Sequence, residues 1–202
     1  MSRRKAKLNM KYLMTSLLCM APLAAFAGPF GLDIGKTFND YPEVVFEKHK
    51  NNIYIVKRIP APNKFFDTYV VVVSAKSGIC KIRAISETTQ TSKYGTELNA
   101  LYNLMQDALD KKYKTTYKKK LYSYLEQGSL WNEPKYYMMG LLQKEREAVT
   151  IWRANLASNN IQNITMSQTA VDQQSGFIVL DYVGVNLDDC NSETSADNED
   201  GL

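Results

Sequence analysis

Short runs of β-branched and aromatic residues dominate the first part of the chain. Three such runs cover residues 53–59, 68–74 and 79–85, and the middle run contains four consecutive valines. Residues of these types favour strands, and the Lys76-Ser77-Gly78 sequence between the second and third runs is typical of a tight hairpin turn. The pattern therefore predicts three strands, of which the last two pair with each other.

The apolar spacing changes in the middle of the chain. From Leu98 to Leu109, apolar residues recur three or four positions apart, which puts one apolar stripe on a helix over residues 93–113. The same spacing predicts a second helix over residues 135–149.

Strands return near the end of the chain, over residues 150–155, 161–170 and 176–185. The order is strands in hairpins, then helices, then strands again, unlike the strict strand-helix alternation of a parallel sheet. We therefore expect an α+β fold, with a mainly antiparallel sheet of about six strands and a central helical pair packed on one face.

The first 27 residues have the order of a secretory signal peptide. The first eleven contain five basic residues and no acidic one, an apolar stretch covers residues 12–26, and Ala25-Phe26-Ala27 offers a small-x-small cleavage site. The apolar stretch is shorter than the roughly 20 residues that a membrane-spanning helix requires. We expect cleavage after Ala27 and a mature chain that begins at Gly28 in the periplasm. An uncleaved amino-terminal anchor is the alternative.

Cleavage changes the charge of the chain. The precursor carries a net charge of +4, but five of its 25 basic residues leave with the signal peptide, so the mature chain has 20 basic and 21 acidic residues. Six of the acidic residues lie in residues 188–202, which contain no basic residue and few apolar ones. Such a segment buries too little surface to offset its ordering entropy, and we expect an acidic disordered tail. Residues 28–187 then form a single α+β domain.

Two cysteines remain in the mature chain, Cys80 and Cys190. In an exported protein, an even number of cysteines favours a disulfide over a metal site or a nucleophile. The bridge would join an early strand to the end of the last one. Two separate thiols are the alternative.

Few residues have the arrangement of a catalytic site. His49, the only histidine, lies among charged residues, and we expect it to be solvated at the surface. The sequence contains no Gly-rich phosphate loop, paired metal-ligand motif or nucleophile elbow. We expect no cofactor and no metal. Glu133, beside Trp131, could be the acid of a hydrolase, because two carboxylates suffice for glycosidase chemistry. The alternative is a turn residue ahead of the second helix.

A basic cluster with interleaved tyrosines is the best functional signal. Its members are Lys111, Lys112, Tyr113, Lys114, Tyr117, Lys118, Lys119 and Lys120. Cations between aromatic faces can hold anionic lipid headgroups, wall polymers, nucleic acid or an acidic protein surface. Two alternatives remain open: a solvated helix end whose lysines complement the helix dipole, and an internal contact in which the acidic tail folds back on the lysines.

Three local motifs resemble those of uncharacterised exported proteins of Gram-negative bacteria. They are the opening Phe30-Gly31-Leu32-x-x-Gly35, the strand from Tyr69 that leads to Gly78-Ile79-Cys80-Lys81-Ile82, and Gly128-Ser129-x-Trp131 ahead of a Met-Met helix. The resemblance covers most of the mature chain. It implies a periplasmic location, and it assigns no activity to the chain and no role to any residue.

These observations favour a non-catalytic periplasmic binding protein of the cell envelope that uses the basic cluster. Its partner would be an envelope protein or an anionic polymer, with no specific nucleic acid and no membrane span after cleavage. A hydrolase of an envelope component, with Glu133 as its acid, is the alternative hypothesis, and a purely structural role is the third.

Overall fold

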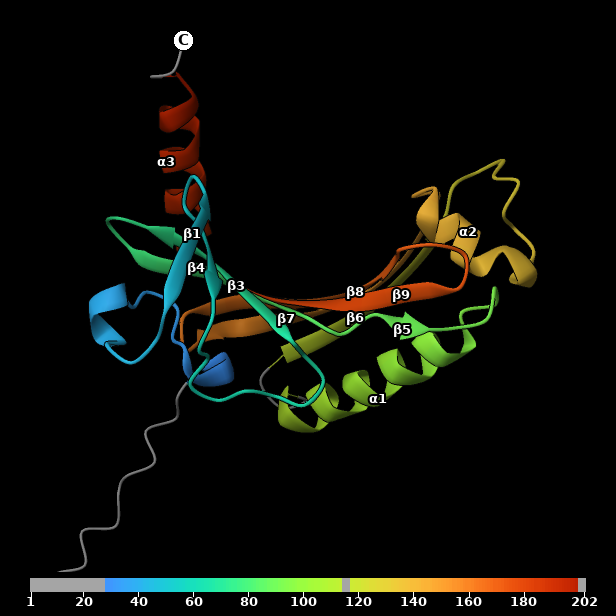
Figure 1. Cartoon of the computed structure of the whole chain (residues 1–202), viewed down its shortest axis with the longest axis horizontal. Helices are drawn as coiled ribbons and strands as arrows, with labels where there is room; N and C mark the ends of the chain where they lie inside the picture. The colour runs from blue at the N-terminus through green and yellow to red at the C-terminus, as the bar shows by residue number, and fades with distance from the viewer. Residues whose placement is uncertain (1–27, 114–116, 200–202) are drawn as a thin grey trace, which may run out of the picture.

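A computed structural model describes the backbone of residues 28–113 and 117–199 (Figure 1). Within these ranges it describes all side chains except those of residues 117–122, 154–158 and 194–199. The strands are β1 Phe46–Lys50, β2 Ile53–Val56, β3 Thr68–Ser74, β4 Gly78–Ile85, β5 Thr89–Gln90, β6 Tyr117–Leu125, β7 Arg146–Ser158, β8 Ile161–Ala170 and β9 Ser175–Gly184. The helices are α1 Thr96–Tyr113, α2 Tyr137–Leu142 and α3 Leu187–Glu199, with short 3-10 helices η1 Pro29–Gly31, η2 Phe38–Asp40 and η3 Pro134–Tyr136.

The described strands form one antiparallel sheet in the order β1-β2-β3-β4-β9-β8-β7-β6, with β5 paired to β9. The expected α+β class and antiparallel sheet are confirmed, but the expectation of about six strands was wrong, because the sheet has nine. The strands β1, β5 and β6 were missed. Two of them, β1 and β6, are rich in lysine and therefore lack the apolar pattern from which strands were predicted.

Helix α1 covers one face of the sheet (Figure 1). Its apolar stripe is buried, as the spacing predicted: Leu98, Tyr102, Met105 and Leu109 all belong to the main core. On the sheet side, the core contains Trp152, whose indole Nε1 donates a hydrogen bond of 2.7 Å to the Asp110 carboxylate on α1. Burial of these side chains supplies most of the energy that holds α1 on the sheet.

The second predicted helix is much shorter than residues 135–149. After η3, helix α2 ends at Leu142, and strand β7 begins at Arg146 because the β-branched residues of this segment pair with β6 and β8. Helix α2 lies at one end of the sheet, against β7 and β8, rather than beside α1 as a helical pair (Figure 1). The Tyr137 hydroxyl lies 3.1 Å from Asn99 Oδ1 on α1 and 2.9 Å from Gln168 Oε1 on β8.

The acidic segment after Leu187 is a helix, α3, rather than the expected disordered tail. The disulfide between Cys80 on β4 and Cys190 on α3 is present and confirms the predicted pairing, although Cys190 lies in a helix and not at a strand end. Glu193 accepts hydrogen bonds from the Ser74 hydroxyl at 2.7 Å and the Ala75 amide at 2.9 Å. The Ser74 bond is the main reason that the pKa of Glu193 lies below its ordinary value. Disorder was predicted from amino-acid composition, which contains no information about the disulfide and the Glu193 hydrogen bonds that hold α3 on the sheet.

Candidate functional site

The basic cluster of residues 111–120 is divided between two elements. Lys111, Lys112 and Tyr113 form the last turn of α1, whereas Tyr117 to Lys120 begin strand β6, and Lys114 lies outside the described residues. The Lys112 Nζ lies 5.1 Å from the centroid of the Tyr113 ring. The lysines of α1 occupy the position at which cations complement a helix dipole, so this part of the cluster fits the helix-end alternative.

Strand β6 is the edge strand beyond β7, and its register connects the remaining lysines to the rest of the sheet. Lys118 lies opposite Arg153, and Lys120 lies opposite Ile151. Directly opposed residues of antiparallel strands share a face of the sheet. The first row continues across the sheet from Arg153 through Asn163 and Val183 to Lys81, and the second from Ile151 through Thr165 and Asp181 to Arg83.

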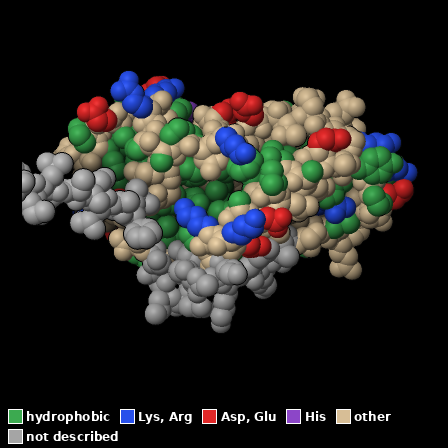
Figure 2. Space-filling model, turned by 90° about the horizontal axis from the view of Figure 1, so that it is seen from below, with side chains coloured by type: hydrophobic (Ala, Val, Ile, Leu, Met, Phe, Trp, Pro, Cys, Tyr) green, Lys and Arg blue, Asp and Glu red, His purple; other side chains and the backbone are tan. Residues whose placement is uncertain are grey.

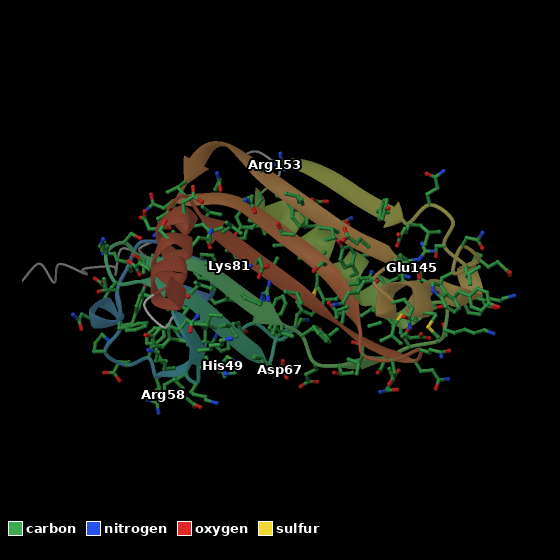
Figure 3. The ribbon with its side chains drawn as sticks, turned by 90° about the horizontal axis from the view of Figure 1, so that it is seen from above. His49, Arg58, Asp67, Lys81, Glu145 and Arg153 are labelled. Carbon is green, nitrogen blue, oxygen red and sulfur yellow. A yellow bond between two sulfur atoms is a disulfide. The ribbon has the colours of Figure 1, made fainter. Side chains whose placement is uncertain are left out.

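These two rows lie on the face that α1 does not cover. Trp152, the neighbour of Arg153 on β7, is buried under α1, and side chains alternate between faces along a strand. We call this surface the open sheet face and define it by Arg153, Asn163, Lys81, Thr165, Asp181 and Arg83. In Figure 3, none of the described helices crosses the strands between Lys81 and Arg153. Helices α3 and α2 lie at the two ends of the open sheet face.

Asp181 is the centre of an ion cluster on the open sheet face. Arg83 donates to it through Nε at 2.7 Å and Nη2 at 2.8 Å, and the Lys81 Nζ lies 2.9 Å from Oδ2. The hydrogen bonds to Asp181 raise the pKa of Arg83 above its ordinary value. Asp181 is buried, and the paired guanidinium and ammonium offset the cost of removing its charge from water. Across the two rows, Lys81, Arg83 and Arg153 provide three positive charges against the single carboxylate.

Apolar side chains separate the cations on this side of the sheet. Val72 lies opposite Lys81 and Val70 opposite Arg83, while Val183 and Ile151 stand within the two rows. All four are half-buried. The surface therefore offers both positive charge and β-branched apolar groups to a partner.

The opposite side of the molecule contains a cavity of about 350 Å³. It lies between α1, the segment 61–66 and the amino-terminal turn. Figure 2, viewed from this side, shows hydrophobic side chains in a hollow beside basic side chains. Its lining includes Phe30, Phe65, Phe66, Met105, Leu109, Lys112, Leu180 and Tyr182. Sequence reasoning missed this cavity, since the only local signal was the pair Phe65-Phe66 in a loop between two strands.

Glu133 lies on the surface at the start of η3. Its carboxylate is exposed and forms an ion pair with the Lys135 Nζ at 2.8 Å. It lines neither the cavity nor the open sheet face. This position agrees with the turn interpretation of Glu133. His49 is exposed on the edge strand β1, which agrees with the interpretation of surface histidine.

Two absences hold for residues 28–113 and 117–199, the part of the chain that the structure describes. No three or more His, Cys, Asp or Glu residues lie together in a group that could hold a metal ion. No described helix has the length and apolar character needed to cross a membrane.

Comparisons with models of known protein families, with curated proteins and with solved structures returned no match. The resemblance to exported proteins through Phe30-Gly31-Leu32-x-x-Gly35 therefore stays a prediction.

Proposed function

We propose that this chain is a non-catalytic binding protein of the periplasm whose open sheet face binds an acidic partner. The observation that carries the proposal is the excess of positive charge in the two rows from Lys81 and Arg83 to Arg153, on the uncovered side of the sheet. The register positions of Lys118 and Lys120 continue the same rows at the edge. Charge complementarity of this kind steers an anionic partner to the surface and fixes its orientation.

The mixture of groups favours an acidic protein segment over a purely hydrophilic anionic polymer. Val70, Val72, Val183 and Ile151 are half-buried among the cations and gain free energy when a partner covers them. An envelope protein with alternating acidic and apolar residues would satisfy both kinds of group. A hydrophilic polymer would satisfy only the charges.

The proposed location rests on two observations. The amino-terminal sequence has the order of a cleavable export signal. The Cys80–Cys190 disulfide is compatible with an oxidising compartment, where such bonds persist.

The hydrolase alternative has no support in the described geometry. Glu133 is exposed and paired with Lys135, so it lacks the apolar pocket in which glycosidases hold a catalytic acid. We therefore expect Glu133→Gln to leave function unchanged.

A charge-reversal series tests the proposal. The variant Lys118→Glu, Lys120→Glu, Arg153→Glu is compared with a control that carries the same charge change on exposed lysines elsewhere: Lys64→Glu, Lys93→Glu, Lys144→Glu. The probe is a fluorescent synthetic peptide of alternating Glu and Val, with polyglutamate as the polymer comparison. Exposed ion pairs are each worth a few tenths to about 1 kcal/mol, so the three reversals are expected to weaken peptide binding about tenfold or more.

The control variant and Glu133→Gln are expected to bind the peptide as the wild type does. Tighter binding of polyglutamate than of the peptide would indicate that the partner is an anionic polymer and not a protein. If both charge-reversal variants are folded and lose equal affinity for the peptide, net charge alone governs binding. This result would contradict the proposal that the open sheet face is the binding site.

A further inference from the structure

The amide nitrogen of Gly28 contacts the side chain of Asp33. It donates a hydrogen bond of 2.6 Å to Asp33 Oδ1, and both residues are partly buried. Gly28 is the residue directly before η1, whose residues line the cavity under α1. It is also the first residue of the mature chain if the signal peptide is cleaved after Ala27.

Only glycine fits at position 28 in this arrangement. A Cβ atom there would overlap the Leu32 carbonyl oxygen and would lie 2.7 Å from Asp33 Oδ1. The absence of a side chain allows the Gly28 nitrogen to approach the carboxylate this closely.

Asp33 is oriented from its other side by Tyr41. The Asp33 amide donates to the Tyr41 hydroxyl oxygen at 2.7 Å, and that hydroxyl lies 3.4 Å from Asp33 Oδ2. No lysine or arginine in the described part of the chain forms an ion pair with Asp33. Its carboxylate is therefore partly buried, held in position and without a cationic side chain.

We propose that Asp33 is the binding site for the α-ammonium group that signal-peptide cleavage creates at Gly28. A membrane-bound signal peptidase adds water across the Ala27–Gly28 amide bond, which leaves a carboxylate on Ala27 and an amine on Gly28. The amine takes up a proton at neutral pH and becomes a cation. The neutral N–H contact at 2.6 Å then becomes a charge-assisted ion pair, which is roughly twice as strong.

This ion pair would fix the turn that forms one wall of the cavity. Phe30, in the middle of η1, has a positive φ of 59°, a conformation that a bulky residue adopts only when its surroundings enforce it. Its ring packs edge-on against Tyr69 at 4.9 Å and Tyr182 at 5.8 Å between centroids. Processing of the precursor would thus complete the wall that carries Phe30.

The test measures the reactivity of the new amino terminus. The full precursor is expressed with export, the mature protein is purified from the periplasm, and its mass identifies the first residue. The protein is then acylated at pH 7, and the rate at Gly28 is followed by mass spectrometry with the lysine-containing peptides as internal reference. An ammonium held by Asp33 loses its proton less readily, and each pKa unit makes the reactive amine tenfold rarer.

We expect Gly28 of the wild type to react at least about tenfold more slowly than Gly28 of Asp33→Asn. Asp67→Asn is the matched control, because Asp67 is an exposed carboxylate next to Phe66, whose ring packs against Phe30, and its loss changes the net charge equally. It is expected to react as the wild type does. A mature chain that begins at Ala27 keeps Asp33 but moves its amine by up to about 3.8 Å, and it is expected to react quickly. This variant remains informative if Asp33→Asn fails to fold.

Two results would overturn the inference. One is a mature chain that begins at a residue other than Gly28. The other is an equal acylation rate for the wild type and the Ala27-started chain, with both folded. The inference rests on cleavage after Ala27 and not on binding at the open sheet face. Asp33→Asn is expected to bind the acidic peptide normally, so the two proposals fail independently.

Discussion

At the scale of single residues, polar groups buried under α1 are paired across the boundary between helix and sheet. The Tyr102 hydroxyl lies 2.8 Å from Thr150 Oγ1 and 2.9 Å from the Met166 carbonyl oxygen. The Thr150 hydroxyl in turn donates to Gln106 Oε1 at 2.9 Å. Because an unpaired polar group at this depth would be costly, these contacts fix the position of α1 as well as stabilising it.

Alkaline pH is expected to weaken the fold through its buried tyrosines. Burial raises the pKa of Tyr102 to about 12 and that of Tyr41 to about 12, from an ordinary value of 10.0. Between pH 10 and about 12 the folded state keeps protons that the unfolded state has released, so the free energy of unfolding falls as pH rises through this window. Below this window the titration of these groups adds no pH dependence to the stability.

Urea unfolding midpoints at pH 8, 10 and 11.5 measure this dependence. Tyr102→Phe is expected to lower stability at pH 8 by about 1–3 kcal/mol, since Thr150 and Met166 lose a partner, and to flatten the alkaline decline. Tyr124→Phe, at an exposed tyrosine, is the control. An identical decline in wild type and Tyr102→Phe would contradict the assignment.

Sequence reasoning recovered residue contacts that are local or that follow from residue counts. Thr37 and Asp40 are three positions apart, a spacing that permits a cap, and the Thr37 amide donates to Asp40 Oδ2 at 2.8 Å. The disulfide followed from the number of cysteines. The Arg83–Asp181 pair was missed because its members are 98 positions apart. Only the register of β4 and β9 brings them together, and no local pattern encodes that register.

At the scale of elements, the two edge strands explain part of the lysine content. Strand β1 contains Lys48 and Lys50, and β6 contains Lys118, Lys119 and Lys120. Charged residues on edge strands discourage pairing with another chain, so these lysines protect the sheet whatever they bind. Because of these charges, neither strand has the apolar pattern from which strands were predicted. By contrast, β3, with four consecutive valines, and β8, with two isoleucines and two threonines, were predicted with their observed bounds.

Removal of the disulfide is expected to loosen α3 and destabilise the whole fold. The bridge closes a loop with a sequence separation of 110 residues, for which the chain-entropy model gives at most about 4–5 kcal/mol. Cys80→Ser with Cys190→Ser is therefore expected to lower the free energy of unfolding by about 2–5 kcal/mol.

Hydrogen exchange locates the effect of this change. Residues 187–193 are expected to lose protection first, because α3 then keeps hydrogen bonds to the sheet but no covalent link. These bonds are those of Glu193 to Ser74 and Ala75 and that of the Asn52 side-chain amide to the Cys190 carbonyl oxygen. The far end of strand β8, residues 166–170, pairs with the start of β9 away from Cys80 and serves as the internal control. Unchanged protection of α3 in the double variant would show that the helix does not depend on the disulfide.

At the scale of the whole molecule, the two faces of the sheet differ in kind. One is covered by α1 over an apolar core, and the other presents the cations and half-buried valines of the open sheet face between α2 and α3 (Figure 1). The hydrophobic pattern indicated the fold class and the covered face. It did not indicate the open one, because Lys81, Arg83 and Arg153 are unremarkable until the strands are placed side by side.

In-cell photo-crosslinking from Thr165 tests the central claim most directly. Thr165 lies in the middle of the open sheet face, opposite Ile151 and Asp181. A photoreactive residue at this position is compared with one at Leu104, which is exposed on α1 on the covered side. We predict a discrete adduct in the envelope fraction from Thr165 that is absent from Leu104 and is lost in the Lys118→Glu, Lys120→Glu, Arg153→Glu background. An adduct from Leu104 alone, with both proteins folded and exported, would contradict the proposal.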